Sequence, residues 1–363
     1  MADKINNEKS PRLMSIDTLR GFDMFFIMGG GMIIKALCSL YPSTFSSAIA
    51  KQMQHVKWDG FAFEDMIFPL FLFIAGISFP FSYAKSLSKG VSVAKVRLNI
   101  IKRALILILL GVIYNNGIRF DIDNMRFCSV LGRIGIAWAF GAMFFTMFST
   151  RIRIAIAISI LLAYWGILQL GDWTLQGNIV AVVDRAVMLG RLHEKVFDPE
   201  GLLSALPAIS TAMLGIFAGE LVKDSKLTEN KKVLTLVGIG AGLVAVGLLW
   251  DCVLPINKKL WTSSYVCFAG GLSYLFFALF YWVVDVLKFR KWTFFFIVIG
   301  MNSITVYLAQ KLIYFPKTKE FLFGGTIKLL PVEYQATASA FCYMLTIWLF
   351  LYILYRKNIF LKV

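Results

Sequence analysis

Residues 55–76 read HVKWDGFAFEDMIFPLFLFIAG, and this stretch decides both the class of fold and the place of its chemistry. Its second half begins an apolar run that is long enough to cross a bilayer, which takes about 20 helical residues. Its first half places His55, Asp59, Glu64 and Asp65 directly in front of that run. Because charges are costly at a membrane, the pattern predicts a functional site at the mouth of a transmembrane helix.

The apolar pattern recurs along the whole chain of 363 residues. Hydrophobic residues make up 58% of it, charged residues only 16%, and the mean hydropathy is +0.73. In soluble globular proteins about a quarter of the residues are charged, so this composition excludes a soluble globular domain. We predict an all-α polytopic membrane protein with about ten transmembrane helices, at residues 16–40, 63–84, 99–116, 127–149, 152–170, 202–222, 233–250, 264–284, 294–314 and 334–355.

The formal net charge of +16 reflects Lys and Arg that gather in alternate loops, such as KSLSKGVSVAKVR at 85–97 and KFRK at 288–291. The positive-inside rule then places these loops, and both termini, in the cytoplasm. The membrane topology explains the positive net charge, so we do not expect nucleic acid as a partner. A basic inner rim can also attract an anionic cofactor.

The predicted organisation is one membrane domain, residues 16–355, between cytoplasmic tails at 1–15 and 356–363. The polar start, MADKINNEKSPR, predicts that no cleavable signal peptide precedes the first span. Five scattered cysteines and only two histidines show neither a disulfide framework nor metal-ligand spacing, so no metal is expected.

The first span carries three charged residues, Asp17, Arg20 and Asp23, at intervals of three. This spacing places successive members on nearly the same side of a helix. Each costs about 2.5 to 3.5 kcal/mol at the bilayer centre, so they should face a partner or a wet cavity. The alternative to a functional site is a salt-bridge network that only locks helices together.

Arg133 in the fourth span and Asn302 in the ninth are further polar residues at membrane depth. A guanidinium keeps its proton, so Arg133 needs a carboxylate, carbonyls or a ligand phosphate or amide, and Asp23 and Asp65 are its candidate partners. Asn302 either contributes to a site or joins helices by hydrogen bonds.

His55 and Asp65 are the candidate catalytic pair. Histidine is the side chain best suited to accept a proton at neutral pH. Asp65, in the first turn of the second span, would be favoured by the helix dipole and could orient the imidazole, as the third member of a catalytic triad does. The alternative is an interfacial histidine whose polar tip lies among lipid headgroups.

The outer loops contain side chains that are suited to binding an aminosugar. FDPEGLL at 197–203 contributes Asp198 and Glu200, and PINKKLWTSSY at 255–265 contributes Asn257, Lys258 and Trp261. Carboxylates suit an amine, and amides and an aromatic plate suit a sugar. Ordinary solvated loop residues are the alternative for each of them.

Six motifs in order resemble the heparan-alpha-glucosaminide N-acetyltransferase family of transmembrane acyltransferases, closest to its short bacterial branch of NagX-like proteins. The resemblance covers about residues 12–315 and rests on RLMSIDTLRGFDMF, the stretch at 55–76, LGRIGIAW, FDPEGLL, PINKKLWTSSY and GMNSITVY. The family's active-site histidine falls on His55, in an intact HxxWxG context, and its acidic residue before FP falls on Asp65. The family's Asn before the glycines has no counterpart, since FFIMGGG stands at 25–31.

The resemblance implies an integral enzyme of a bacterial cytoplasmic (inner) membrane that moves acetyl from cytosolic acetyl-CoA to glucosamine, or a terminal glucosaminide, on the outer side. The large luminal domain of the lysosomal relatives has no counterpart here, which favours a small aminosugar. Membrane lipid surrounds the protein, and a homodimer is left open.

The predicted mechanism docks CoA at the inner face and runs its pantetheine arm between the helices toward His55. The candidates for cofactor binding are Asp17, Arg20, Lys102, Arg103 and Arg133. Lys102 and Arg103 are equally suited to anchoring the third span. The candidates for substrate binding are Asp23, Asp198, Glu200, Asn257, Lys258, Trp261 and Asn302. Direct transfer with His55 as base competes with an acetyl-His55 intermediate, and an aminosugar permease is the rival function.

Overall fold

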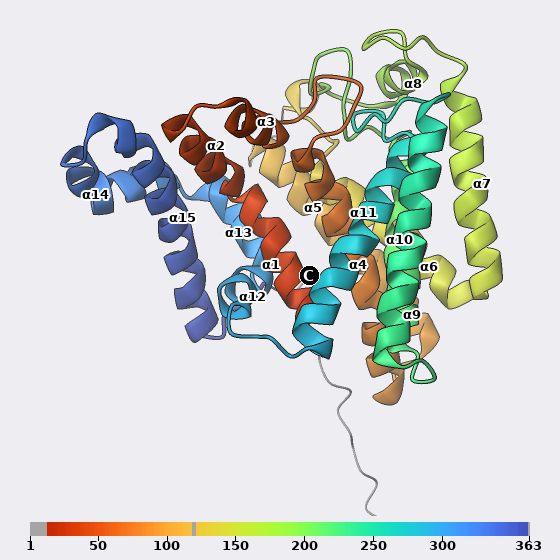
Figure 1. Cartoon of the computed structure of the whole chain (residues 1–363). Helices are drawn as coiled ribbons and strands as arrows, with labels where there is room; N and C mark the ends of the chain where they lie inside the picture. Colours follow the sequence, from red (N-terminus) through yellow and green to blue (C-terminus); the bar gives the residue numbers. More distant parts are fainter. Residues whose placement is uncertain (1–12, 118–120, 362–363) are drawn as a thin grey trace, which may run out of the picture.

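The computed structural model describes residues 13–117 and 121–361, which form helices joined by loops, without a β-sheet (Figure 1). The first half of the chain forms α1 (Met14–Ile27), α2 (Gly30–Leu40), α3 (Thr44–Gln52), α4 (Phe63–Ser88), α5 (Val93–Asn116), the short 3-10 helix η1 (Ile122–Asn124), α6 (Val130–Met147) and α7 (Thr150–Leu168). The second half forms α8 (Ile179–Val187), α9 (Ala205–Lys223), α10 (Glu229–Asp251), α11 (Ser263–Tyr281), the π-helical turn η2 (Trp282–Val286), α12 (Thr293–Gly300), α13 (Ser303–Leu312), α14 (Phe315–Lys328) and α15 (Val332–Arg356).

The predicted all-α polytopic fold is confirmed, with seven to nine candidate spans in the described residues beside the roughly ten predicted. Within the described residues, seven helices are long and apolar enough to cross a membrane, or nine if each of two bent pairs is one span. The seven are α4, α6, α7, α9, α10, α11 together with η2, and α15. The predicted span at 99–116 is not among them. It lies in α5, which carries Lys95, Arg97, Lys102 and Arg103 in its first half.

Two of the predicted spans are broken helices. The span predicted at 16–40 is α1 and α2, bent by 60°, and the span predicted at 294–314 is α12 and α13, bent by 68°. At the first break Gly29 has a left-handed backbone with φ of 116°, which glycine adopts without steric cost. At the second break Asn302 begins α13 from a non-helical conformation. Each break leaves helix-terminal backbone groups inside the fold, which lipid alone could not satisfy.

The long helix α4 is fixed at the centre of the bundle by its contact with α9. A Cβ atom at Gly76 would lie 2.3 Å from the Ala212 carbonyl oxygen, and one at Gly215 would lie 2.0 Å from the Phe73 carbonyl oxygen. Only glycine at these positions lets the two backbones approach so closely, as small residues do in membrane helix pairs. The first turn of α4, which carries Glu64 and Asp65, is therefore held on a rigid support.

Helix α1 lies between two groups of helices (Figure 1). It packs against α4 on one side and against α12 on the other, and α12 in turn contacts α15. The short helices α3 and α8 and the long loops gather at one end of the molecule (Figure 1). The site described below lies at this end and extends down between the two groups.

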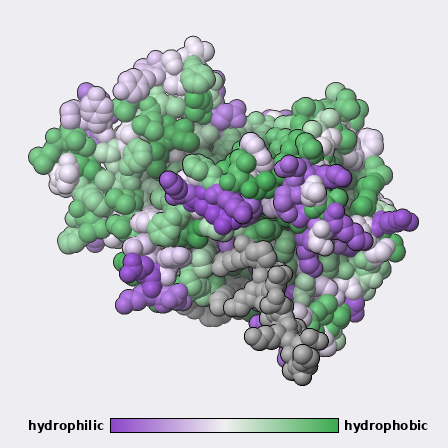
Figure 2. Space-filling view, turned by 60° about the horizontal axis from the view of Figure 1, so that its bottom comes forward, coloured by the Kyte–Doolittle hydropathy of each residue, from purple (hydrophilic) through white to green (hydrophobic). Residues whose placement is uncertain are grey.

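The opposite end of the molecule is hydrophilic across its middle and apolar on its flanks (Figure 2). The loops at this end and the first turn of α10 carry exposed basic residues: Lys226, Lys231, Lys288, Arg290 and Lys291. Such a basic end fits the cytoplasmic side predicted from the positive-inside rule, and the orientation stays a prediction. Of the predicted tails, residues 1–12 and 362–363 lie outside the described residues.

Candidate active site

The loop between α3 and α4 holds His55 beside the first turn of α4. Gly60 has a left-handed backbone with φ of 109°, and its N–H donates to the Ile256 carbonyl at 2.9 Å. The Asp59 carboxylate accepts a hydrogen bond from the Asn257 side-chain amide at 3.1 Å. These contacts tie the His55 loop to the loop before α11. The two motifs that the sequence placed 200 residues apart therefore form one structure.

The His55 imidazole is paired with the buried carboxylate of Asp65. Nδ1 of the ring lies 2.9 Å from Oδ1 of Asp65, and Oδ2 accepts the backbone N–H groups of Ala62 at 3.1 Å and Val56 at 3.3 Å. The Tyr265 hydroxyl donates to the backbone carbonyl of Asp65 at 2.7 Å. The Asp65 side chain is 1% exposed and that of His55 is 58% exposed. The carboxylate is thus fixed, and the ring it orients remains accessible.

Lys258 completes a cluster of three side chains. Its Nζ lies 3.1 Å from Nδ1 of His55 and 3.4 Å from Oδ1 of Asp65. Burial lowers the pKa of the Lys258 ammonium, and the nearby Asp65 carboxylate offsets part of that effect.

The tautomer of His55 follows from these partners. Nδ1 carries at most one hydrogen, so it either donates to Asp65 or accepts from Lys258. An ionised Asp65 can only accept, so it draws both the Nδ1–H and the ammonium toward itself. In this assignment Nε2 of His55 keeps its lone pair, which can accept a proton from a ligand.

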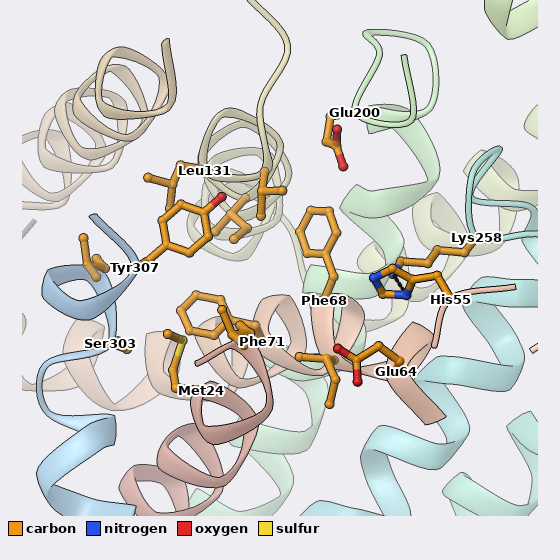
Figure 3. A pocket seen from close by; sticks show the side chains of 15 residues that line it. Met24, His55, Glu64, Phe68, Phe71, Leu131, Glu200, Lys258, Ser303 and Tyr307 are labelled. Carbon is orange, nitrogen blue, oxygen red and sulfur yellow. Dashed lines mark hydrogen bonds between the residues drawn. The ribbon is translucent and has the colours of Figure 1, made fainter. Parts of the chain in front are cut away.

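A cavity of about 310 Å³ opens beside this cluster (Figure 3). His55, Glu64, Glu200 and Lys258 lie toward one end of it, and the Tyr307 ring lies toward the other (Figure 3). The rest of the lining is mostly apolar: Met24, Ile27, Ile67, Phe68, Phe71, Val130, Leu131, Ile134, Ser303 and Ile304. A few convergent polar groups in an otherwise apolar cavity are typical of a small-molecule site.

A second cavity, of about 280 Å³, adjoins the first. It contains Arg20 and Arg103, and the Arg103 guanidinium lies 4.3 Å from the centre of the Trp138 ring. Arg20 donates to the Ser78 hydroxyl at 3.0 Å and lies 3.3 Å from the Asp17 carboxylate. Five residues line both cavities: Phe71, Leu131, Ile134, Ser303 and Ile304. The two cavities therefore share a wall that runs from the arginines toward His55.

Arg133 supports a loop and lines neither cavity in the described part of the chain. Its buried guanidinium donates to the Pro199 carbonyl at 2.5 Å and lies 3.4 Å from the Gly201 carbonyl. The partners suggested from the sequence, Asp23 and Asp65, are replaced by these carbonyls. The guanidinium also donates to the Ser204 hydroxyl, whereas its Nε–H has no partner among the described residues.

Asp198 and Glu200 belong to one ion-pair cluster with Arg126. Arg126 donates to both carboxylate oxygens of Asp198, at 2.7 and 2.6 Å, and to Glu200. Burial opposes the charge on Arg126, but the two carboxylates outweigh it and raise its pKa. Asp198 is fully buried and also accepts the His193 backbone N–H at 3.0 Å. Of the two predicted ligands, only Glu200 reaches the cavity.

Trp261 and Asn257 are buried in the architecture of their loop. The Trp261 indole donates to the Thr211 hydroxyl at 3.2 Å, and its ring lies 4.9 Å below the Arg133 guanidinium. The Asn257 side-chain Oδ1 accepts the Leu260 N–H at 2.9 Å. Both residues are 0% exposed, so neither presents a surface to a sugar.

The other predicted site residues differ in position. Lys102 is exposed on α5 and is not among the described residues that line either cavity. Asn302 is buried at the break between α12 and α13, and its side-chain nitrogen and oxygen have no hydrogen-bond partner among the described residues. Asp23 is 0% exposed, and both of its oxygens are likewise without a partner in the described chain.

Sequence reasoning assigned no role to Ser303 or Tyr307, and it named Glu64 in the stretch at 55–76 without giving it a role of its own. Glu64 stands beside Asp65 in the same helical turn, so its position carried a signal. Tyr307, which stacks on Tyr114 with ring centres 4.5 Å apart, comes from a helix whose bend the periodicity did not reveal. Within the described residues no group of three or more His, Cys, Asp or Glu side chains is arranged to hold a metal ion.

Comparison with known proteins supports the resemblance seen in the motifs. No protein-family model matches the chain. The chain is 26% identical to human heparan-alpha-glucosaminide N-acetyltransferase and 28% identical to the mouse protein of the same name. Each alignment covers 97% of this chain but only 60% of the relative, so the chain spans about three fifths of the length of these relatives. The predicted resemblance to this family is confirmed.

Proposed function

We propose that this protein is a transmembrane N-acetyltransferase, which moves acetyl from acetyl-CoA on the cytoplasmic side to the amine of glucosamine or a terminal glucosaminide on the outer side. The bacterial inner membrane is its proposed location. The observation that carries the proposal is the pair of adjoining cavities, with arginines in one and an oriented histidine in the other.

The donor fits this arrangement in three parts. The phosphates of CoA suit the end with Arg20 and Arg103, since guanidinium groups bind phosphate strongly. The pantetheine arm suits the largely apolar wall that the two cavities share. The thioester then lies between Ser303 and His55. The pantetheine arm needs to cover only part of the bilayer thickness, because both cavities lie inside the fold, between its two ends.

In the proposed reaction His55 is the general base. Nε2 takes a proton from the sugar nitrogen as that nitrogen attacks the thioester carbonyl, and Asp65 holds the ring and stabilises its charge. The Asn302 amide, one candidate for stabilising the oxyanion that forms, is buried at the helix break and is not among the described residues that line the His55 cavity. Arg133, the other candidate for this role, is occupied by loop carbonyls.

The structure favours one alternative function enough to require a test. Broken helices near the middle of a bundle are common in secondary transporters, and this fold contains two. An aminosugar permease is therefore the second candidate. The sequence had shown no broken helices, so this argument for a permease comes from the structure.

One assay separates the two functions. Purified protein in detergent is mixed with acetyl-CoA and glucosamine, and free CoA thiol is measured over time. The proposed enzyme releases thiol and forms N-acetylglucosamine without any membrane gradient. Absence of both products, in protein that still binds the sugar, would favour the permease.

A labelling experiment separates direct transfer from an acetyl-His55 intermediate. The protein is incubated with acetyl-labelled acetyl-CoA and no sugar, then denatured. We expect no label on the protein if transfer is direct. Label that is retained on the wild type and is absent from His55→Ala would establish the covalent route instead.

A further inference from the structure

Two carboxylates beside the His55 cavity, the half-buried Glu64 and the buried Asp23, have no part in the transfer described above. Glu64 lines the cavity, and its carboxylate is directed into it on the side of the His55 ring (Figure 3). Its Oε2 is buried and has no hydrogen-bond partner among the described residues. An ionised group in this state loses hydration without gaining a partner, which is costly.

The wall behind Glu64 is the first turn of α2. A Cβ atom at Gly31 would lie 3.3 Å from Oε2 of Glu64, so the carboxylate abuts the start of this helix. The first N–H groups of a helix have no partner within it and carry partial positive charge. Glu64 is therefore placed where an anion is favoured, although a direct hydrogen bond to it is not formed.

Asp23 is the second unpaired carboxylate. It lies on α1 next to Met24 and one turn before Ile27, and both of these residues line the cavity. Asp23 is 0% exposed, its two oxygens have no partner in the described chain, and it is close enough to Glu64 for the two charges to interact. Two neighbouring carboxylates repel each other, and this repulsion favours the binding of a cation or a proton between them.

The charged groups that face Glu64 come from every element around it. They are His55 and Lys258 from the loops, Lys35 from α2, Asp65 from α4 and Asp23 from α1. Of these groups, the Lys258 ammonium already lies 3.4 Å from the Asp65 carboxylate and 3.1 Å from the His55 ring. The cluster thus contains a carboxylate on the cavity wall whose own pairing is incomplete.

We propose that Glu64, with Asp23 behind it, binds the ammonium form of the acceptor and takes its first proton. This inference rests on the proposed function and specifies its acceptor as a cationic amine. It divides the work between two bases: Glu64 prepares the nucleophile, and His55 serves the acyl transfer. The amide product is uncharged, so it loses the attraction that held the substrate.

The protons and electrons balance as follows. R–NH₃⁺ gives one proton to the Glu64 carboxylate and becomes R–NH₂. The nitrogen lone pair forms the C–N bond at the thioester carbon while the C=O π pair moves to oxygen, and Nε2 of His55 takes the second proton. The intermediate then collapses, the C–S bond breaks with its electron pair on sulfur, and His55 protonates the thiolate. Glu64 releases its proton to water, so one ammonium and one thioester give one amide, one thiol and one proton.

The test compares Glu64→Gln with Glu64→Asp, Asp23→Asn and the exposed control Glu333→Gln. Loss of a contact to a charged group costs about 1.5 to 3 kcal/mol, so Glu64→Gln should raise KM for glucosamine about 10- to 100-fold at neutral pH. KM should fall again at a pH where the free amine is neutral. Glu64→Asp should keep the wild-type pH profile, Asp23→Asn should raise KM less, and Glu333→Gln should match the wild type.

Two further measurements exclude a merely structural effect. Acetyl-CoA affinity should be the same in Glu64→Gln and wild type, which shows that the variant folds. Inhibition by the uncharged product N-acetylglucosamine should also be the same in both, because it makes no use of the carboxylate.

The outcomes distinguish this inference from the function on which it rests. If the wild type releases no CoA with glucosamine, the proposed function itself fails. If the wild type is active but Glu64→Gln has the same KM for glucosamine and the same pH profile, the ammonium subsite is overturned. It is also overturned if Glu64→Gln weakens the binding of N-acetylglucosamine as much as the binding of glucosamine.

Discussion

Two groups of buried charges lie at the same end of this protein, and they differ in how completely they are paired. Around Arg126, both oxygens of Asp198 accept hydrogen bonds from the guanidinium and from nearby N–H groups. Around His55, the ring is open to the cavity, and Oε2 of Glu64 has no partner in the described residues.

The difference separates architecture from chemistry. A buried ion whose hydrogen bonds are all satisfied stabilises one conformation and has no capacity left for a ligand. A buried ion with unused capacity costs free energy in the empty protein and gains it back when a ligand binds. We infer that the Arg126 cluster shapes the outer loops and that the His55 cluster performs the reaction.

The largest effect is expected at His55. His55→Ala should lower kcat for acetyl transfer about 100- to 10,000-fold, because removal of a general base costs that much. His193→Ala is the matched control, since His193 is exposed and uses only its backbone N–H to bond Asp198. Equal activity of the two variants would contradict the assignment of His55.

Substitutions in the Arg126 cluster should lower the stability of the protein rather than its kcat. Asp198→Ala leaves Arg126 buried with an incomplete set of acceptors, which costs about 3 to 5 kcal/mol of stability. We expect a large drop in the unfolding temperature and little folded protein, measured by thermal unfolding in detergent. Asp123→Ala, at an exposed position in the short helix η1, should behave as the wild type. A stable but inactive Asp198→Ala would move this cluster from architecture to chemistry.

Asp184 on α8 provides a test by pH. Burial raises its pKa from 3.8 to about 6, while its hydrogen bond from the Leu202 N–H acts in the other direction. The folded protein therefore keeps a proton between about pH 4 and 6 that the unfolded chain has lost, so stability falls as pH rises through this window.

Asp184→Asn keeps an acceptor for Leu202 but carries no charge. Relative to wild type, the variant should gain on the order of 1 to 3 kcal/mol in stability between about pH 4 and pH 7. The measurement is the unfolding temperature of both proteins at the two pH values. If the unfolding temperatures of the variant and the wild type differ by the same amount at pH 4 and at pH 7, Asp184 titrates in its ordinary range.

The smallest effect concerns the donor end of the cavities. Arg103→Gln should raise KM for acetyl-CoA about 10-fold and leave kcat nearly unchanged, because a charged contact to phosphate is lost in both the ground and transition states. Lys95→Gln, at an exposed position on the same helix, is the control. If both variants behave as the wild type, the CoA phosphates bind elsewhere.

The sequence was sufficient for the class of fold and for the central pair of residues. Apolar runs of membrane length reveal helices without any tertiary information, and His55 and Asp65 share one short stretch. Their contact therefore needs only the turn between α3 and α4. Lys258 was also identified, although its distance from His55 depends on the fold.

Other features depend on geometry that periodicity does not contain. The bends at Gly29 and Asn302 interrupt apolar runs that look continuous, so two spans became four helices. Arg133, Trp261 and Asp198 have the residue types of ligand-binding groups, but their hydrogen bonds are made within the protein, to Pro199, Thr211 and Arg126 respectively. Whether a polar side chain is satisfied is decided by tertiary contacts, and this distinguishes Glu64 from Asp198.

The central claim is that a thioester reaches an outer histidine through the protein from an inner phosphate site. A structure determined with CoA bound tests it most directly. We predict density for the phosphates beside Arg20 and Arg103, and for the thiol sulfur in the cavity next to His55. A CoA molecule whose sulfur lies away from His55, or whose phosphates occupy the end that carries Glu200, would contradict the claim.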